Sequence, residues 1–311
     1  MHTSLSERAE VAAREAVFVA GPTAVGKTEI ALALAEALNG EIVGADAFQV
    51  YEGLALLTAK PSMQELARVP HHLIGTIPLA DSFNVARYLE ASVDAICEIR
   101  ARGRLPIVVG GTGLYFRALT RGLSEAPPAD ESLRESLNQR PLPDLLAQLD
   151  SLDPEAAATI DRQNPRRVTR ALEVILLTGK PFSSFRQEWA NLPKIRAVFL
   201  ERSREELNER IDRRAISMFQ HGVVEEVKSA LEKGEIGDTA GQVIGLREIE
   251  KLLRAEISQT ACIAAIQLGT RQYAKRQVTW FKREPLFHPV TLSHDSKPPE
   301  VAANIAAYFS K

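Results

Sequence analysis

A glycine-rich segment near the start of the chain has the spacing of a phosphate-binding loop. It matches the pattern G-x-x-x-x-G-K-[ST] in full, with Gly21, Pro22, Thr23, Ala24, Val25, Gly26, Lys27 and Thr28. In such a loop successive backbone N–H groups surround an anion, the lysine reaches its terminal phosphate, and the final hydroxyl can bind Mg²⁺. The segment therefore predicts a polyphosphate-binding site with Mg²⁺ as cofactor, held by Thr28, which a nucleotide hydrolase, a kinase and a diphosphate-using transferase would share.

Asp46 stands where a second short apolar run ends, and its carboxylate could accept a proton from an attacking nucleophile. A turn or capping aspartate is the structural alternative. The next apolar run, 105–109, ends in Gly-Gly-Thr-Gly, whereas many nucleotide hydrolases place there an acidic residue that helps to hold Mg²⁺. The absence of that acid weakens the case for a hydrolase.

Two groups of basic residues suit contact with nucleic acid. The segment 270–283 contains no acid, and its cations and aromatics are Arg271, Lys275, Arg276, Lys282, Arg283, Tyr273, Trp280 and Phe281. That mixture suits phosphate contact and base stacking, although an amphipathic core helix would have the same pattern. A second group comprises Arg162, Arg166, Arg167 and Arg170. We expect the two groups to hold one RNA from both sides.

The adjacent pair His71 and His72 is a weaker candidate for metal binding. Neighbouring residues in a strand point to opposite faces, and no cysteine or further histidine completes a zinc set. We therefore expect no metal there.

The candidate residues need a framework that brings them together. Apolar runs at 16–20, 41–45 and 105–109 predict strands, and helical spacing over 29–38 and 85–99 predicts helices between them. Right-handed crossovers put the carboxyl ends of parallel strands on one sheet edge. We therefore expect an α/β fold with a P-loop NTPase-like parallel sheet flanked by helices, and the active site at that edge.

The composition changes between residues 121 and 193. This stretch holds eight of the 17 prolines and has no clear strand, so it predicts a helical insertion domain whose best-marked helix covers 166–178. The chain re-enters the sheet at 197–200. We expect a first part of the catalytic core at 16–120, the insertion at 121–193, and a second part with carboxy-terminal helices at 194–311.

The bulk composition is that of an ordinary globular protein. Apolar residues make up 45%, charged residues 25%, and the net charge is -2, which excludes the disordered and collagen-like classes. No apolar run could span a bilayer, and Met1 to Ala16 lacks a secretory signal pattern. We expect a cytoplasmic protein without a membrane partner, monomeric by default. Cys97 and Cys262 lie in apolar helical patterns, so we interpret both as buried small hydrophobes.

Four stretches together resemble the tRNA dimethylallyltransferase family. They are 21–28, 46–51 with 58–61, 106–115, and 271–281. Weaker similarity links them in collinear order from Val17 to Arg283. The loop motif is common to many proteins, but the other three stretches are specific.

This resemblance implies roles for several residues. The loop would hold the diphosphate of dimethylallyl diphosphate with Mg²⁺. Asp46 matches a general base that takes a proton from N6 of adenosine 37 in tRNA, giving N6-dimethylallyladenosine. Thr112 matches an active-site threonine near the reacting amine. Arg210 and Arg214 resemble an arginine pair for the diphosphate, with Arg214 as the preferred catalytic group. From spacing alone, a solvated helix face is an equal alternative for both arginines.

The resemblance also implies that the insertion grips the anticodon stem-loop of tRNA. The residues expected to contact tRNA are Gln49, Arg166, Arg167, Arg170, Arg271, Lys275, Arg276 and Gln277. The amide of Gln49 could hydrogen-bond the edge of the target base, with a structural loop amide as the alternative.

Four residues depart from the family pattern. Ala47 replaces a serine, Leu57 a glycine, Gly75 an acidic residue, and Leu246 a tyrosine. Loss of the serine hydroxyl could remove one hydrogen bond to the diphosphate, about 0.5–1.5 kcal/mol net. Two alternatives stay open. A small-molecule kinase using ATP would leave the basic groups without a role, and a non-catalytic RNA-binding relative would explain the departures.

Overall fold

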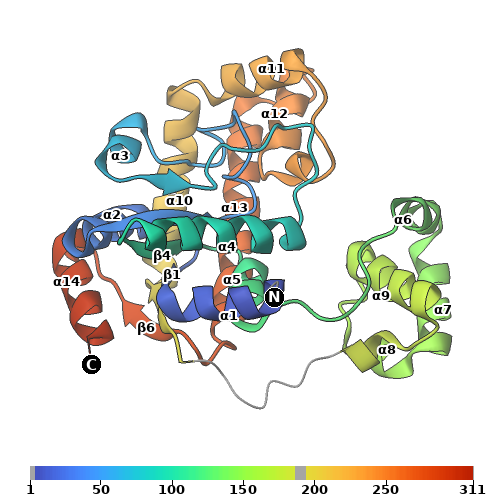
Figure 1. Cartoon of the computed structure of the whole chain (residues 1–311). Coiled ribbons are helices and arrows are strands. Elements are labelled where there is room, and N and C mark those ends of the chain that lie inside the picture. Colours follow the sequence, from blue (N-terminus) through green and yellow to red (C-terminus); the bar gives the residue numbers. More distant parts are fainter. Residues whose placement is uncertain (1–3, 186–193, 311) are drawn as a thin grey trace. The chain divides into compact units, whose positions relative to one another are not determined.

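The chain folds into two compact units. The computed structural model describes residues 4–185 and 194–310. The first unit comprises Met1–Gly122 with Leu192–Lys311, and the second comprises Leu123–Asn191 (Figure 1). The domain boundaries that the sequence predicts are at residues 121 and 193. The role predicted for the second unit, binding of the anticodon stem-loop, stays a prediction.

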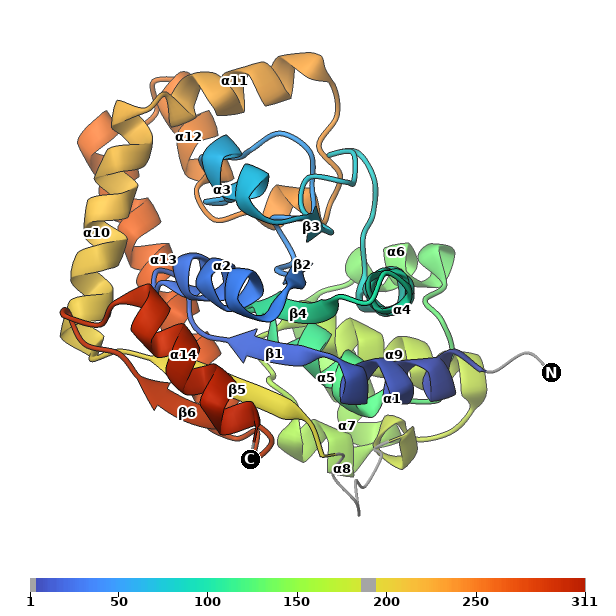
Figure 2. The same ribbon diagram turned by 60° about the vertical axis from the view of Figure 1, so that its left-hand side comes forward.

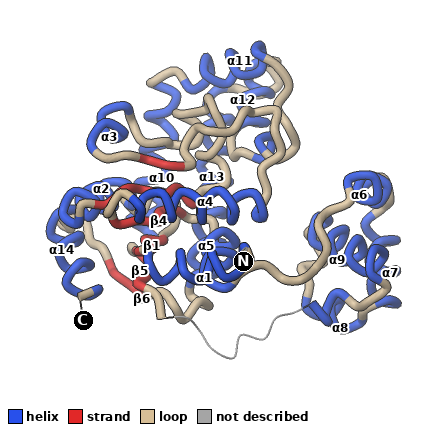
Figure 3. Tube along the Cα trace, viewed as in Figure 1, coloured by secondary structure: helices blue, strands red, loops and turns tan. Residues whose placement is uncertain are grey.

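A parallel sheet forms the centre of the first unit. Its strands are β1 (Val17–Ala20), β2 (Gly40–Ala45), β3 (His71–His72), β4 (Leu105–Gly110), β5 (Arg196–Glu201) and β6 (His288–Thr291). They lie in the order β3-β2-β4-β1-β5-β6, and every pair is parallel. Figure 3 draws the strands in red among the helices. The predicted parallel sheet is thereby confirmed, and β6 is a strand that the apolar pattern did not indicate.

Helices lie on both faces of the sheet, because the connection from β1 to β2 runs towards one edge of the sheet and the connection from β3 to β4 runs back. Helix α2 (Lys27–Leu38) leads from β1 outwards to β2, and α4 (Val85–Ala101) leads back inwards to β4. Because both crossovers are right-handed, the two helices cover opposite faces. Helix α14 (Pro298–Phe309) packs on α2, whereas α1 (Leu5–Glu15) and α5 (Gly113–Arg121) pack with α4 (Figures 1 and 2).

The carboxy-terminal helices form a second layer with its own apolar core. They are α10 (Arg204–Gln220), α11 (Val223–Lys233), α12 (Leu246–Leu253) and α13 (Gln259–Phe281), and the short α3 (Met63–Arg68) lies between β2 and β3 in the chain. Their buried side chains, among them Val227, Ile249 and Ile266, pack with Leu54 and Leu57 from the loop after β2. This packing fixes that loop above the sheet edge.

The second unit is a small helical bundle. Its helices are α6 (Glu131–Asn138), α7 (Leu142–Leu152), α8 (Pro154–Thr159), α9 (Pro165–Thr178) and the 3₁₀ turn η1 (Phe182–Phe185). The fully buried carboxylate of Glu173 accepts hydrogen bonds from Arg170 at 2.6 Å, Arg134 at 2.9 Å and the Asp130 amide at 3.0 Å. The two guanidinium groups hold the pKa of Glu173 below its usual value against the effect of burial. Loss of either arginine would leave this buried charge without full compensation, which destabilises a fold strongly.

One cysteine prediction is wrong. Cys262 is buried, but Cys97 is exposed. The buried stripe of α4 includes Leu89, Val93 and Ile96, and a residue directly after Ile96 is turned about 100° away from that stripe.

Among residues 4–185 and 194–310, no helix combines the length and the hydropathy that crossing a membrane requires.

Truncating Leu32 tests the core beneath the sheet. Leu32 is fully buried on α2, so Leu32→Ala should lower the free energy of unfolding by about 2–5 kcal/mol through lost burial and a residual cavity. Urea unfolding measures the loss. Leu231→Ala, at a side chain that is 36% exposed, is the control, and equal losses in both variants would contradict this packing.

Candidate active site

The phosphate-binding loop leaves the sheet beside two other loops. Ala20 and Ala45, which end β1 and β2, are both aligned with Gly110 at the end of β4. A Cβ on Gly110 would overlap the carbonyl group of Ala45, so this close approach requires glycine. The sequence-predicted convergence of the three segments at one edge is thus present.

Lys27 lies inside the phosphate-binding loop. Its ammonium group donates hydrogen bonds to the carbonyl oxygens of Gly21 at 2.9 Å and Pro22 at 2.8 Å. Burial lowers the pKa of Lys27 to about 8, since the charged form loses hydration. The loop then turns into α2 through Gly26 at φ 104°, which leaves the first amides of the helix without a side-chain cap. Amides without a side-chain cap and a half-buried cation favour an anion.

Asp46 follows β2 with one carboxylate oxygen engaged. Oδ1 accepts the backbone N–H groups of Phe48 at 3.0 Å and Gln49 at 3.3 Å. The hydrogen bonds within the described part of the chain do not engage Oδ2. The turn interpretation and the base interpretation are therefore both compatible with the geometry, because one oxygen fixes the loop and the other is open to a nucleophile.

Thr112 joins the β4 loop to the segment that carries Asp46. Its Oγ1 accepts the N–H of Ala47 at 3.0 Å, and its own N–H donates to the carbonyl oxygen of Ala45 at 3.1 Å. Burial raises the pKa of the neighbouring Tyr273, so its phenol stays neutral. Thr112 therefore holds the two residues that flank Asp46, and its role near the reacting amine stays a prediction.

Arginines of α10 reach the phosphate-binding loop from the side. Arg214 donates to Oγ1 of Thr23 at 2.6 Å, and Arg210 donates to the carbonyl oxygen of Ala24 at 2.7 Å. Burial lowers the pKa of both guanidinium groups. These contacts exclude the solvated-face alternative for the pair.

Sequence reasoning missed a third arginine at the loop. Arg202 directly follows β5, donates to the carbonyl oxygen of Val25 at 2.8 Å and pairs with Glu206. Arg202 is the first cation after β5, a strand that ends at the same sheet edge as β1. This position in the sequence could have predicted its contact with the loop.

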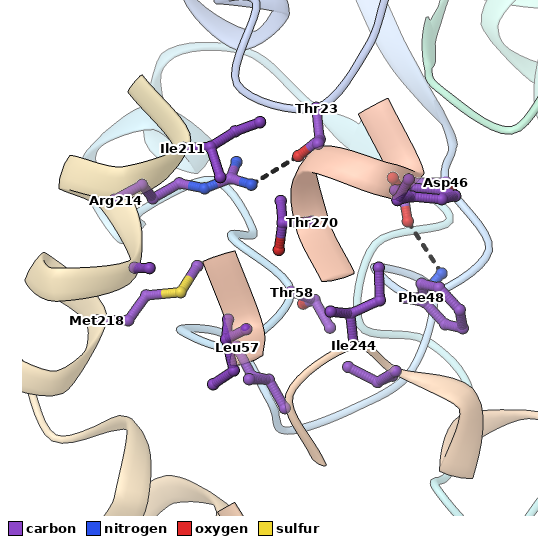
Figure 4. A pocket seen from close by; sticks show the side chains of 14 residues that line it. Thr23, Asp46, Phe48, Leu57, Thr58, Ile211, Arg214, Met218, Ile244 and Thr270 are labelled. Atoms are coloured by element: carbon purple, nitrogen blue, oxygen red, sulfur yellow. Dashed lines mark hydrogen bonds between the residues drawn. The ribbon is translucent and has the colours of Figure 1, made fainter. Parts of the chain in front are cut away.

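Two cavities meet at Asp46. The larger, about 480 Å³, is lined mainly by polar groups, including Lys27, Thr28, Lys60, Arg210 and Arg213. The smaller, about 60 Å³, is mainly apolar. Both are lined by Thr23, Asp46, Thr58 and Arg214, which Figure 4 shows around the smaller cavity. A molecule with a charged part and a hydrocarbon part could thus place its junction beside Asp46.

The donor groups in the larger cavity fit a magnesium ion held mostly by its ligand. Thr28 supplies a hydroxyl to the lining of this cavity, and Mg²⁺ typically takes one or two protein oxygens besides phosphate oxygens and water. Within the described ranges, no cluster of three or more His, Cys, Asp or Glu side chains could hold a metal alone. His72 instead pairs with the buried Glu41 at 2.7 Å.

The residues predicted to contact tRNA fall into distinct groups. Arg166 and Arg167 on α9, and Lys275 and Arg276 on α13, have exposed side chains. The others are engaged within the protein. Arg170 pairs with Glu173 and donates to the Pro127 carbonyl, Arg271 pairs with Asp212 at 2.9 Å, and the Gln49 amide donates to the carbonyls of Thr58 and Ala59.

The prediction that Gln277 contacts tRNA is wrong. Gln277 is 5% exposed, its Oε1 accepts the N–H of Thr23 at 2.9 Å, and its Nε2 donates to the carbonyl oxygen of Gly111 at 2.9 Å. A Cβ on Gly111 would overlap this amide. Gln277 therefore joins the phosphate-binding loop to the β4 loop. It lies on the inner side of α13 although its neighbours in sequence are cations.

Of the four departures from the family pattern, two lie in apolar surroundings. Leu57 lines the smaller cavity, and Leu246 is buried in the core of the carboxy-terminal helices. Ala47 stands beside Asp46 and contributes its backbone N–H to Thr112. Gly75 adopts φ 64°, a conformation that suits glycine better than an acidic residue.

Comparison with known proteins gives a consistent set of relatives. A family model described as IPP transferase matches residues 49–284. A tRNA dimethylallyltransferase of Akkermansia muciniphila is 44% identical, covering 93% of this chain and 97% of the relative. One of Rhodopseudomonas palustris is 43% identical, covering 86% and 87%.

Solved structures agree. A full-length tRNA isopentenylpyrophosphate transferase from Bacillus halodurans matches with a TM-score of 0.70 and 36% identity, covering 96% of this chain and 97% of the other. A eukaryotic dimethylallyltransferase, crystallised while acting on tRNA, matches with a TM-score of 0.80 and 28% identity, covering 96% and 78%.

Replacing the Gln277 amide tests its bridging role. Gln277→Glu puts a carboxylate oxygen against the Gly111 carbonyl, so affinity for inorganic pyrophosphate should fall at least about tenfold, with about 1–3 kcal/mol of stability lost. Calorimetry and urea unfolding measure the two effects. Gln272→Glu makes the same change at an exposed position of α13 and should leave both unchanged. Unaltered pyrophosphate binding in Gln277→Glu would refute the bridge.

The lowered pKa of Lys27 predicts a pH dependence. Between pH 7 and pH 9 the free protein should lose about tenfold in pyrophosphate affinity, because the amine becomes neutral above a pKa of about 8. Titration calorimetry at several pH values measures this. Lys27→Arg keeps its charge throughout that range, so its affinity should fall less. The ionisation of pyrophosphate affects both proteins equally, and parallel pH profiles would show that Lys27 does not titrate there.

Proposed function

The chain belongs to the IPP transferase family, which confirms the predicted resemblance, and we propose that it transfers a dimethylallyl group from dimethylallyl diphosphate to N6 of adenosine 37 in tRNA. One observation carries the proposal: a polar cavity that suits a diphosphate and an apolar cavity that suits a hydrocarbon meet at the carboxylate of Asp46. The names of the relatives support the same donor and acceptor.

The reaction needs one bond formed and one broken at the same carbon. The lone pair of N6 forms a bond to C1 of the dimethylallyl group, and the C1–O bond breaks with its electrons passing to the diphosphate. The proton of N6 passes to Oδ2 of Asp46, the oxygen that the loop leaves open. The exocyclic amine of adenine is a poor nucleophile, so proton removal and alignment must act together.

The leaving diphosphate needs positive charge around it. Lys27, Arg210 and Arg214 line the larger cavity, and the uncapped amides of α2 add the positive end of the helix dipole. When bound beside Thr28, Mg²⁺ would supply further neutralisation of the phosphate oxygens. Of these three cations only Arg214 lines both cavities, so we assign its guanidinium to the charge that develops at the bond that breaks. Thr112 keeps the Asp46 segment at the β4 loop.

Contact with tRNA rests on exposed cations in each unit. Lys275 and Arg276 on α13 suit phosphate contact, and the guanidinium of Arg276 lies over the Tyr273 ring at 5.7 Å. Arg166 and Arg167 give α9 of the second unit an exposed basic surface, which supports its role in binding the anticodon stem-loop. Since tRNA is the substrate, we also propose that the enzyme acts in the cytoplasm, as a monomer.

Two other functions are less consistent with the site. A small-molecule kinase using ATP would need the phosphate-binding loop but not an apolar cavity beside the candidate base. A protein that only binds RNA can contact RNA phosphates on its surface. It would not need Lys27, Arg210 and Arg214 together in a cavity at the phosphate-binding loop.

Asp46→Asn tests the proposed base. Transfer of labelled dimethylallyl from its diphosphate to unmodified tRNA is measured beside ATP consumption. We expect label in the tRNA and no use of ATP with the natural sequence. Asp46→Asn cannot accept the proton, so its kcat should fall by about 10²–10⁴-fold while tRNA affinity changes little.

Asp81→Asn makes the same chemical change at an exposed position outside both cavities and serves as control. Equal losses of turnover and of tRNA affinity in Asp46→Asn would remove its assignment as base. ATP consumption without labelled tRNA would favour the kinase.

A further inference from the structure

We propose that Glu226 is a positioning residue for the transfer reaction, which holds the turn 54–60 in place as a shared wall of the two cavities. The inference rests on the proposed function, because that function places the prenyl donor in these cavities. Glu226 belongs to α11 and acts on the donor through the turn.

The turn 54–60 contributes side chains to both cavities. Thr58 lines both of them, Lys60 lines the larger and Leu57 lines the smaller. Figure 4 shows Thr58 and Leu57 at the smaller cavity. The position of this turn therefore determines the shape of the space that a donor occupies.

The backbone of the turn is strained at two residues. Leu54 has φ 45° and Ala59 has φ 51°, a conformation that residues other than glycine adopt rarely. Such a backbone persists only where surrounding contacts fix it. Within the turn, the N–H and the hydroxyl of Thr58 both donate to the carbonyl oxygen of Leu54, the hydroxyl at 2.7 Å. These bonds close the turn on itself but do not attach it to the rest of the fold.

The carboxylate of Glu226 provides that attachment. Its Oε1 accepts the N–H of Leu56 at 2.8 Å, and its Oε2 accepts the N–H of Leu57 at 3.0 Å. Hydrogen bonds to an ionised acceptor are stronger than those to a neutral one, and Glu226 is half-buried, which limits competition from water. Two consecutive amides of the turn are therefore fixed to α11.

The carbonyl groups of the same turn are bound to the segment that carries the candidate base. The amide of Gln49 donates to the carbonyl oxygens of Thr58 at 3.1 Å and Ala59 at 2.8 Å. The backbone N–H of Gln49 donates to Oδ1 of Asp46 at 3.3 Å. The turn is thus bonded to α11 through its amides and to the Asp46 segment through its carbonyls.

Glu226 also affects the charge of Lys60. Burial lowers the pKa of Lys60, and the negative charge of Glu226 acts in the opposite direction. The ammonium group of Lys60 donates to the carbonyl oxygens of Gly53, at 2.5 Å, and Tyr51. Glu226 therefore favours a cation in the lining of the larger cavity, where the diphosphate of a donor would bind.

Glu226→Gln in the whole chain tests the inference. The glutamine keeps the size of the side chain but offers one acceptor oxygen, so its NH₂ group would face one of the two amides of the turn. Titration calorimetry with Mg²⁺ should show at least about fivefold weaker binding of dimethylallyl diphosphate. Affinity for unmodified tRNA should stay within about twofold, whereas a general loosening of the fold would weaken the binding of both ligands.

Glu225→Gln is the matched control. Glu225 is the exposed neighbour of Glu226, and both lie in the first turn of α11, so both variants lose the same interaction with the helix dipole. This control should keep both affinities. Should Glu226→Gln fail to fold, Glu226→Asp, which has a shorter side chain, should show the same loss of donor affinity at smaller size.

Three outcomes would overturn the role of Glu226. They are an unchanged donor affinity in a folded Glu226 variant, equal losses for donor and tRNA, and the same donor loss in Glu225→Gln.

Label transfer to tRNA, measured separately with the same variants, distinguishes the two proposals. Loss of donor affinity in Glu226→Gln, together with no transfer by the natural sequence, would sink the proposed function and leave Glu226 as the residue that holds the wall. Transfer by the natural sequence, together with unchanged donor affinity in Glu226→Gln, would sink the role of Glu226 alone.

Discussion

The buried amide of Gln277 holds together the two loops on which the chemistry depends. One end of the amide binds the Thr23 N–H and the other binds the Gly111 carbonyl, so the phosphate-binding loop and the β4 loop keep a fixed separation. Thr112, the next residue after Gly111, in turn holds the segment that carries Asp46. The relative position of the diphosphate site and the base is thus set by a chain of neutral hydrogen bonds, which salt does not screen.

The cations at the phosphate-binding loop lose part of their hydration when the chain folds. Lys27 and Arg214 are half-buried near each other's positive charge, and Asp46 is the anion that compensates both. Their donors meanwhile bind neutral oxygens, namely backbone carbonyls and the Thr23 hydroxyl. A diphosphate offers better acceptors than these, so its arrival relieves an unfavourable arrangement that folding alone has to tolerate.

Much of the framework was predictable from the sequence, and the shape of the cavities was not. Strands β1, β2, β4 and β5 have apolar runs, and the loop motif has its own spacing, so the meeting of the three loops follows from the crossover rule. Cations next to Gln277 in the sequence favoured an exposed side chain there. Its burial follows only from the packing of α13 against the two loops. The apolar cavity is lined by Leu57, Met218 and Ile244 from three separate segments, and no local sequence pattern predicts that these segments meet.

The hydrogen bond between Thr23 and Gln277 joins residues 254 positions apart in the chain. On the ribosome, the glycine-rich segment emerges long before the helix that completes it. Until α13 has been synthesised, this loop lacks its partner and the hydrocarbon chamber lacks the part of its wall that Ile266, Thr270 and Tyr273 supply. An unfinished chain therefore cannot begin turnover, however well its first strands have folded.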